Sequence, residues 1–350
     1  MERQDQGMAF MLQYENVAWY ENGKVRILDR RIYPTEIKFV ECNSYKEVAQ
    51  AITDMVTQSA GPYTAAGMGM ALAAYECRGQ EESKQREFLK KAAHTISNAR
   101  PTTANRLKAV TDGCLKAADE AFVFGKNPVE AIFLRTIDSL NRRYKTMGVV
   151  GEYLADLFPK NGTILTQCFG ETIIGTMLRA AQKNNNNVKI ICAETRPYLQ
   201  GARLTSSCCY EMGFDTTVIT DNMVAYAMQH KGIDIFTSAA DTIARDGHIA
   251  NKIGTFQMAI LAKYFGLPYF VTGIPDKDKA SGKNIIIEER NPELVLKYRG
   301  IANTLEGVKA IYPSFDVVPP HLISGVVTDK GVFTPYTLND YFKTEIKEFY

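Results

Sequence analysis

The 350-residue sequence has little excess charge and no long apolar run. Lys and Arg number 41 against 39 Asp and Glu, and a net charge of +2 is too small to attract nucleic acid or an anionic membrane surface by itself. No apolar run approaches the roughly 20 residues that a bilayer-spanning helix needs. Residues 1–6 are polar, where a signal peptide would have basic and apolar regions. We therefore expect a cytoplasmic protein whose partner is a small molecule, and neither nucleic acid nor a membrane.

Several cofactor and metal motifs are also missing. No Walker A loop is present, and no G-x-G-x-x-G follows an expected strand, which disfavours nucleotide hydrolysis and nicotinamide or flavin chemistry. The seven cysteines are odd in number and show no C-x-x-C spacing, so we expect reduced thiols. The four histidines lie far apart without metal-ligand spacing: His94, His230, His248 and His321. No cofactor and no metal is expected, and acid, base, thiol and phosphate-binding chemistry remains.

The N-terminal part of the sequence favours a small sheet followed by helices. Strand-like alternation at 17–20 and 25–28 surrounds a turn, which predicts a hairpin, and a third strand-like stretch follows at 37–42. Ser44, with Glu47 three residues later, predicts a capped helix. Helical periodicity covers 45–58, 65–76, 85–97, 102–124 and 127–158.

The C-terminal part alternates short apolar runs with helical stretches. The runs recur every 20 to 30 residues, at 163–166, 188–192, 216–219, 233–236 and 268–271. This spacing is typical of βαβ units and predicts an α/β fold with a doubly wound, Rossmann-like parallel sheet. We expect two domains, an N-terminal α+β domain at 1–140 that ends in a long linking helix and a Rossmann-like catalytic domain at 141–350. Ligands should then bind at the carboxyl ends of the parallel strands.

Cys168 and Asp241 each follow one of these predicted strands. Cys168 lies where a strand meets a helix N-terminus, and the helix dipole there would favour its thiolate. Asp241 follows the 233–236 strand among small residues. Each also has a plain structural interpretation, Cys168 as a packed thiol and Asp241 as a helix N-cap. Position alone leaves both interpretations open.

Two other segments are candidates for binding phosphate. Asn251 and Lys252 precede Gly254, Thr255 and a helical run, so the lysine and backbone amides could hold a phosphate at a helix start. Arg100 stands directly before Pro101 at another predicted helix start, where its guanidinium would suit a phosphate. The alternative for Arg100 is a surface arginine that enters a turn.

At these residues the sequence resembles the methylthioribose-1-phosphate isomerases. Their superfamily also includes ribose-1,5-bisphosphate isomerase and the regulatory subunits of translation initiation factor 2B. The resemblance spans nearly the whole chain, and the 194–205 and 220–223 runs favour the isomerase branch. The matching residues are 100–102, 162–168, 194–197 with 200–205, 219–223, Asp241 with Gly247 and 250–255, 288–292, and 315–317 with Pro319, together with the hairpin around Trp19.

The resemblance implies a homodimeric aldose-ketose isomerase that converts 5-methylthioribose 1-phosphate, a furanose 1-phosphate, into 5-methylthioribulose 1-phosphate in methionine salvage. By that resemblance Cys168 and Asp241 are catalytic, with Asp241 as a proton donor that burial keeps protonated. The same resemblance implies that the substrate is held by Arg100, Gln200, Asn251 and Lys252.

The sequence departs from the family beside these positions. The family's arginine-glycine-alanine-proline loop falls at 57–62, and its arginine is missing. Gln167 and Phe169 replace the usual His and Asn around Cys168, and Thr242 replaces the Arg after Asp241. These changes should alter the 5-substituent pocket or the phosphate contacts. The alternatives are therefore 5-deoxyribose 1-phosphate or ribose 1,5-bisphosphate as substrate, or a non-catalytic protein like the initiation-factor subunits.

Overall fold

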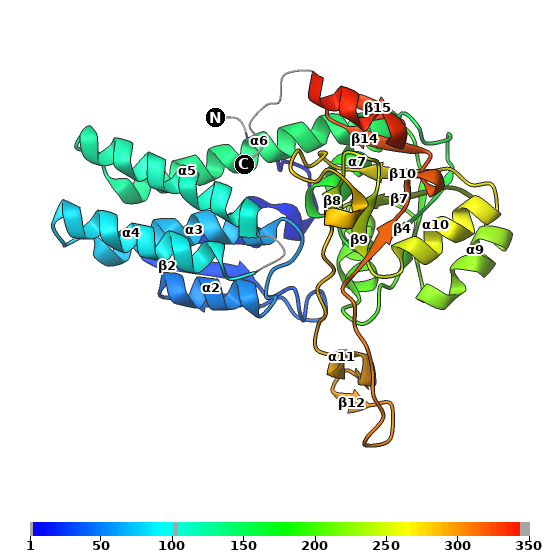
Figure 1. The fold of residues 1–350 in the computed structure, drawn as a ribbon, viewed down its shortest axis with the longest axis horizontal. Helices are drawn as coiled ribbons and strands as arrows, with labels where there is room; N and C mark the ends of the chain where they lie inside the picture. The colour runs from blue at the N-terminus through cyan, green and yellow to red at the C-terminus, as the bar shows by residue number, and fades with distance from the viewer. Residues whose placement is uncertain (1–2, 101–103, 344–350) are drawn as a thin grey trace. The chain divides into compact units, whose positions relative to one another are not determined.

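The computed structural model describes residues 3–100 and 104–343 (Figure 1). Their contacts divide the chain into two compact units, and the boundary between Lys145 and Thr146 falls inside the long helix α6 (Pro128–Ala155). No helix in the described ranges is long and apolar enough to cross a membrane.

A three-stranded antiparallel sheet opens the first unit. After the short helices η1 (Phe10–Leu12) and α1 (Tyr14–Val17), its strands are β1 (Ala18–Glu21), β2 (Lys24–Leu28) and β3 (Phe39–Cys42). The hairpin turn has positive φ at Asn22 (50°) and Gly23 (77°), as the right-handed twist of paired strands requires. The predicted hairpin and third strand are confirmed.

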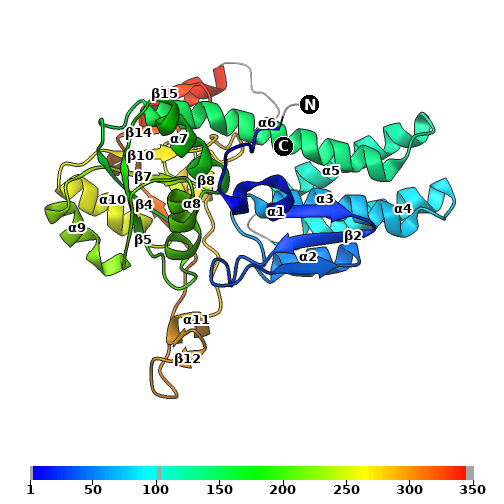
Figure 2. The same cartoon turned by 180° about the vertical axis from the view of Figure 1, so that it is seen from behind.

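Helices make up the rest of the first unit. They are α2 (Tyr45–Thr53), α3 (Gly61–Cys77), α4 (Glu82–Ser97), α5 (Ala104–Val123) and the first part of α6. α3 is buried along almost its whole length because it is apolar on every side, and it contacts α2, α4, α5 and the sheet. Figure 2 shows β2 beside it. The start of the predicted 102–124 helix, at Thr102 and Thr103, lies outside the described residues.

The second helix is shorter than the sequence periodicity predicts. Ser44 caps it as expected, accepting from the Glu47 amide at 3.3 Å, but the Glu47 carboxylate accepts from the Asn43 amide instead of the Ser44 amide. The helix ends at Thr53 because Met55 adopts a left-handed φ of 59°. The chain then turns so that the carbonyl of Val56 accepts from the Arg30 amide at 2.8 Å.

A seven-stranded sheet forms the centre of the second unit. Its order is β15-β14-β10-β7-β4-β5-β6, and every neighbouring pair is parallel except β14 with β15. The strands are β4 (Thr163–Gln167), β5 (Lys189–Ala193), β6 (Thr216–Ile219), β7 (Ile233–Ala239), β10 (Tyr269–Thr272), β14 (Gly325–Thr328) and β15 (Gly331–Phe333). All five predicted strands are present, and the predicted parallel Rossmann-like sheet is confirmed.

The order of the strands reverses between β4 and β7. From β4 the chain moves outward through β5 and β6, and then it returns to the other side of β4 and moves outward again through β7, β10 and β14. Such a topological switch point leaves a crevice beyond the carboxyl ends of the two central strands, where open α/β sheets bind their ligands. The residues that follow β4 and β7 therefore line the expected site.

Helices cover both faces of this sheet. α9 (Val224–His230) and α10 (Thr255–Tyr264) pack on one face, where their apolar side chains join those of the strands in a common core. α7 (Glu171–Lys183) packs against the end of α6, since Thr176 Oγ1 donates to the Met147 carbonyl at 2.9 Å. Further short helices of this unit are η3 (Gly201–Thr205), α8 (Ser206–Glu211), η4 (Asp221–Met223), η6 (Pro320–Leu322) and η7 (Pro335–Lys343).

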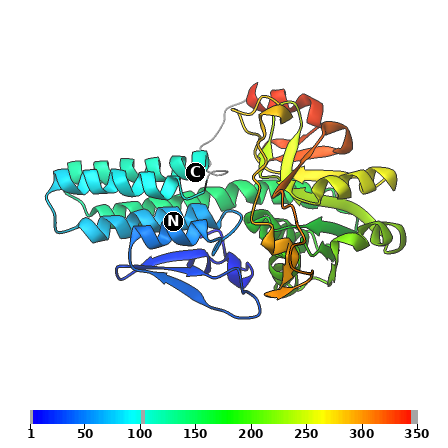
Figure 3. The ribbon, with the colours of Figure 1, turned by 60° about the horizontal axis from the view of Figure 1, so that its bottom comes forward.

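Two features of the second unit have no counterpart in the sequence predictions. A small antiparallel sheet joins β8 (Thr242–Ile243), β9 (Ile249–Lys252) and β13 (Phe315–Val318). Between β10 and β13 the chain forms an arm, residues 285–312, which projects from the sheet (orange in Figures 1 and 3). The segment from β10 to β13 contains η5 (Gly282–Asn284), α11 (Glu293–Leu296), β11 (Lys297–Tyr298) and β12 (Ile301–Ala302).

The carboxylate of Asp316 caps helix α10 from the neighbouring strand β13. It accepts from the amides of Gly254 at 2.7 Å and Phe256 at 3.0 Å, two donors that a helix N-terminus leaves unsatisfied. Asp316→Ala should lower the free energy of unfolding by about 1 kcal/mol. The urea midpoint followed by circular dichroism measures this loss, and the exposed Asp278→Ala is the control. Equal midpoints for the two variants would contradict the cap.

Candidate active site

Cys168 lies just beyond β4 in a strained backbone conformation. Its φ is 59°, in the left-handed region that non-glycine residues seldom adopt. Two threonines fix this conformation: the Cys168 amide donates to Thr195 Oγ1 at 2.8 Å, and the Cys168 carbonyl accepts from the hydroxyl of Thr205. Strain of this kind costs about 1–3 kcal/mol and is concentrated at functional sites. Tertiary contacts therefore hold Cys168 in a backbone conformation that its local sequence does not favour.

The segment after β5 is held in place by a carboxylate. Asp221 accepts from the amides of Thr195 at 2.9 Å and Arg196 at 2.7 Å. Thr195 and Leu199 also have positive φ, at 64° and 58°. These contacts explain how the predicted 194–205 run forms a fixed wall beside Cys168.

Gln200 stands at the start of the π-helix η3 in this wall. Its side chain is buried, and its Oε1 atom has no hydrogen-bond partner among the described residues. The following Gly201 lies so close to β5 that an added Cβ would be 1.8 Å from the Ala193 carbonyl. π-helical turns are rare and are often found at functional sites. Gln200 therefore lies in the second unit, and its side-chain oxygen is available as a hydrogen-bond acceptor for a ligand.

Asp241 follows β7 and leads into β8, on the other side of the switch point. Its amide donates to the Ala250 carbonyl of β9 at 2.8 Å, so the residue is fixed by the small sheet and is not a helix N-cap. The expectation that burial keeps this carboxyl protonated is wrong, because Asp241 is exposed. The residue lies at the rim of the crevice, where only a bound ligand could remove it from water.

Asn251 and Lys252 are buried at the end of β9. Asn251 Nδ2 donates to Thr255 Oγ1 at 3.1 Å, and Lys252 Nζ lies 4.2 Å from the centroid of the Phe315 ring. Gln167, one of the departures from the family pattern, donates its amide to the Lys252 carbonyl at 3.2 Å. Gln167 thus ties β4 to the strand that carries the lysine. The amides of the following helix are less available than expected, because Asp316 already accepts from two of them.

Electrostatic effects bring these residues together around the Cys168 thiol. Burial raises the pKa of Cys168 to about 11, while the charge of Lys252 lowers it, Asp241 raises it and Arg290 lowers it. Since burial dominates, the thiol is protonated at neutral pH, and the expectation of thiolate character from the helix dipole is wrong. The charges of Lys252, Asp241 and Arg290 all act on this sulfur, so the residues share one site.

The raised pKa of Cys168 predicts a slow, strongly pH-dependent alkylation. From its ordinary value of 9.0 to about 11, the shift reduces the thiolate fraction at pH 8 about 100-fold. The rate with iodoacetamide should therefore rise about tenfold per pH unit up to pH 10. Peptide mass spectrometry at each pH separates Cys168 from the six buried cysteines, and free cysteine, whose rate levels off near its own pKa, is the control. Alkylation of Cys168 at pH 7 as fast as that of free cysteine would contradict a neutral thiol.

Arg290 and Tyr312 complete this group, and sequence reasoning does not select either as a site residue. They lie at the base of the arm, where the Arg290 amide donates to the Tyr312 carbonyl at 2.9 Å. Burial raises the pKa of Tyr312 to about 12 and the charge of Arg290 lowers it. The signal available in the sequence was an arginine inside the matched 288–292 run.

A pocket opens under Cys168 between the sheet and α7. It contains Gln167 and Cys168, so it meets the candidate site at the end of β4. Its walls combine apolar side chains with hydroxyl groups from the carboxyl ends of β4, β7 and β10: Leu154, Thr166, Gln167, Cys168, Gly170, Ile173, Ile174, Met177, Thr205, Thr237, Ser238, Ala239 and Thr272. In the described part of the chain, no group of three or more His, Cys, Asp or Glu side chains is placed to hold a metal ion.

Arg100 and the arginine-less loop belong to the first unit. Arg100 is buried after α4, and its neighbours Pro101 to Thr103 lie outside the described residues. In the 57–62 loop, Ser59 has a φ of 60°, and the guanidinium of the buried Arg30 donates to the Gln58 carbonyl at 2.9 Å. The Arg30 side chain thus stabilises the loop through this hydrogen bond. The role of Arg100 in binding the substrate stays a prediction.

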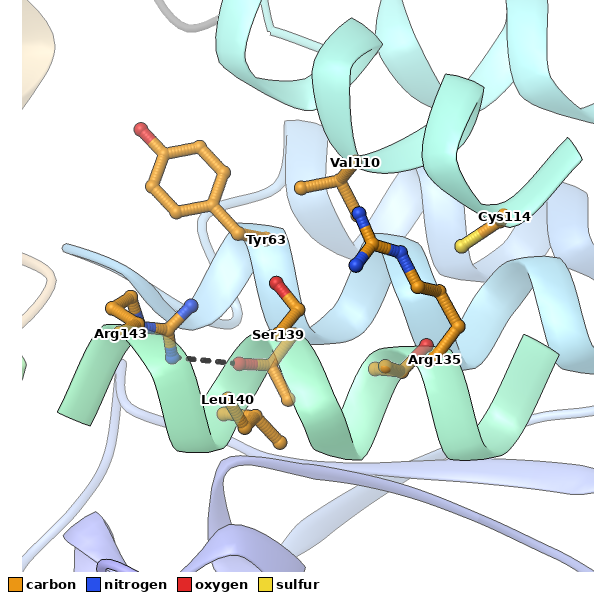
Figure 4. A pocket seen from close by; sticks show the side chains of 9 residues that line it. Tyr63, Val110, Cys114, Arg135, Ser139, Leu140 and Arg143 are labelled. Carbon is orange, nitrogen blue, oxygen red and sulfur yellow. Dashed lines mark hydrogen bonds between the residues drawn. The ribbon is translucent and has the colours of Figure 1, made fainter. Parts of the chain in front are cut away.

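A separate pocket lies within the first unit, between α3, α5 and α6 (Figure 4). Arg135, Ser139 and Arg143 project into it from one face of α6, and Arg143 Nη2 donates to Thr64 Oγ1 at 3.1 Å. Burial raises the pKa of the nearby Cys114 to about 12. None of the described residues that line this pocket is a carboxylic acid, so they offer no counterpart to Asp241.

Comparison with known proteins identifies the family of the chain. The family described as Initiation factor 2 subunit family matches residues 58–335, more than half of the chain. Methylthioribose-1-phosphate isomerases of Chloroflexus aurantiacus and Desulforudis audaxviator are each 35% identical to it, over 91% of this chain and 94% of theirs.

Solved structures of the same family also resemble this chain. The 5-methylthioribose 1-phosphate isomerase of Pyrococcus horikoshii is 30% identical with a TM-score of 0.80, covering 95% of this chain and 98% of that one. The translation initiation factor eIF-2B subunit delta of A. fulgidus is 29% identical with a TM-score of 0.79, covering 94% and 99%. The chain therefore belongs to the initiation factor 2 subunit family and, within it, to the methylthioribose-1-phosphate isomerases.

Proposed function

We propose that this protein converts 5-methylthioribose 1-phosphate into 5-methylthioribulose 1-phosphate, a reaction of methionine salvage. The observation that carries the proposal is the placement of Cys168 and Asp241 after the two strands of the switch point, with Lys252 beside them. The names of the relatives supply the substrate. A thiol, a carboxyl and a cation around one crevice are the groups that an isomerase of a sugar phosphate needs.

The chemistry begins with the ring oxygen of the sugar. Phosphate on the anomeric oxygen prevents ordinary opening to a free aldehyde, so the bond from C1 to the ring oxygen must break with the phosphate in place. We assign Asp241, in its acid form, the donation of a proton to the departing ring oxygen. A substrate lying over Asp241 would remove its exposed carboxyl from water, which favours the acid form.

Cys168 remains neutral during the transfer between C1 and C2. A thiol with a pKa of about 11 is not a base at pH 7, and we propose that the C2 hydrogen moves to C1 with its electron pair. The C2 hydroxyl then loses its proton to the Asp241 carboxylate and becomes the ketone, which restores the acid. No proton is gained or lost overall, and the thiol provides a desolvated wall beside the two carbons.

The remaining site residues are proposed to bind the substrate. We assign the phosphate to Asn251 and Lys252, which are buried next to Cys168, and the sugar hydroxyls to the unpartnered amide oxygen of Gln200. Arg100 is a further phosphate ligand by family resemblance. We also propose a homodimer in the cytoplasm, in keeping with seven free cysteines.

A substrate panel tests the proposal. The purified chain is given 5-methylthioribose 1-phosphate, 5-deoxyribose 1-phosphate and ribose 1,5-bisphosphate, and proton NMR in D2O follows the ketose signals and the origin of the new C1 hydrogen. We expect the highest kcat/KM with the methylthio sugar and no deuterium at C1. Binding of all three sugars without turnover would instead support a regulatory protein, as the likeness to the initiation-factor subunit allows.

A further inference from the structure

The guanidinium of Arg290 is buried with its terminal nitrogens unused. The side chain is 7% exposed, and Nε donates to Glu288 Oε1 at 3.3 Å. Nη1 and Nη2 make no hydrogen bond of ordinary geometry in the described ranges, and neither does the hydroxyl of the buried Tyr312, although Arg290 and Tyr312 lie close enough to interact with each other. Because buried N–H groups without acceptors are unfavourable even when the charge itself is paired, these terminal nitrogens indicate a place for a ligand.

Its surroundings hold Arg290 rigidly. The guanidinium carbon lies 5.9 Å from the ring centroids of both Tyr198 and Phe315. Phe315 is also the ring under Lys252 Nζ, at 4.2 Å. Two cations therefore share one aromatic neighbour next to Cys168, and the carboxylate of Glu288 contacts only the Nε side of Arg290. The free end of the guanidinium is a fixed fork.

We propose that Arg290 and Tyr312 form a phosphate subsite, in which Nη1 and Nη2 donate to two oxygens of the 1-phosphate and the Tyr312 hydroxyl donates to the third. The fork of a guanidinium matches two phosphate oxygens, while a lysine supplies a point charge. Lys252 and Arg290 then bind the phosphate together. The arm thus supplies a cation in a chain whose 57–62 loop has no arginine. The subsite rests on the proposed function for the identity of its ligand.

Phosphate binding by the full-length protein tests this subsite without relying on turnover. Inorganic phosphate, α-ribose 1-phosphate and ribose 5-phosphate are titrated at constant ionic strength and followed by 31P NMR. Arg290→Gln should raise the Kd for inorganic phosphate and ribose 1-phosphate about 30-fold, and Arg290→Lys about fivefold, because lysine keeps the charge and loses the fork. Tyr312→Phe should raise it about threefold. Arg299→Gln, at an exposed arginine of the same arm, is the matched control and should change nothing.

Three other results would overturn the subsite. An unchanged Kd for inorganic phosphate in Arg290→Gln, with kcat reduced, would place the guanidinium at the reacting carbons. A loss confined to ribose 5-phosphate would assign it to a 5-phosphate. If circular dichroism shows that Arg290→Gln does not fold, the phosphate Kd of Arg290→Lys tests the subsite instead. Wild-type affinity in that variant would contradict binding by the guanidinium fork. Arg290-dependent binding without turnover of any sugar would leave the subsite standing and remove the proposed isomerase activity.

Discussion

Asp241→Asn should lower kcat by about a thousandfold while KM changes by less than about threefold. Asparagine has nearly the same size as aspartate, and its backbone amide keeps the hydrogen bond to the Ala250 carbonyl that fixes the residue. Its side chain, however, has no acidic proton to give to the ring oxygen. The loss should therefore fall on the transition state and not on binding. Steady-state kinetics with 5-methylthioribose 1-phosphate, followed by the ketose signals, measures both constants.

The control for this prediction is Asp278→Asn. Asp278 is an exposed aspartate of the same unit, so the change in charge is the same without the change at the site. It should leave kcat at the wild-type value. A kcat within tenfold of wild type in Asp241→Asn would show that another group protonates the ring oxygen, and the assignment of Asp241 as the acid would be wrong.

Cys168→Ala should lower kcat about a hundredfold without loss of substrate affinity. The thiol lies at the carboxyl end of β4, where the charges of Lys252 and Asp241 act on it, and alanine would leave room for water beside C1 and C2. Because the thiol is neutral up to about pH 10, wild-type kcat should show no ionisation of this group between pH 6 and pH 9. A pH series of kcat and KM for both proteins is the measurement.

The same substitution at Cys42 provides the comparison. Cys42 is a buried thiol of the first unit, so Cys42→Ala removes an equivalent side chain away from Cys168. It should retain full activity with a modest loss of stability. Wild-type kcat in Cys168→Ala would rule out a part for the thiol in the transfer. A wild-type profile that rises with a pKa near 7 would indicate a thiolate base instead.

The strands of the large sheet and their parallel arrangement could be predicted because both follow from local sequence pattern. The apolar runs that became β4 and β7 are short, regularly spaced and separated by helical periodicity, so a parallel sheet was predictable, and with it the edge where Cys168 and Asp241 lie. The hairpin of β1 and β2 was equally readable, because its turn needs residues that tolerate positive φ. Local chemistry was sufficient in each case.

Properties that depend on distant neighbours could not be read in this way. The protonated state of Cys168 results from burial by segments that include Thr195 and Thr205, far along the chain. The exposure of Asp241 depends on the small sheet, whose strand β13 arrives some 60 residues after β9. Within the described part of the chain, Arg290 is distinguished by terminal nitrogens that make no hydrogen bond of ordinary geometry. No periodicity in the sequence reports such absences.

The left-handed backbone of Cys168 has a consequence for how this protein can evolve. At a φ of 59° glycine is the residue that the chain itself prefers, since it carries no Cβ to oppose that conformation. Selection for stability alone would thus favour glycine at this position, whereas the part proposed for the thiol in turnover requires cysteine. On that proposal the molecule gives up part of its folding free energy to place the sulfur correctly, a stability–activity compromise at one residue.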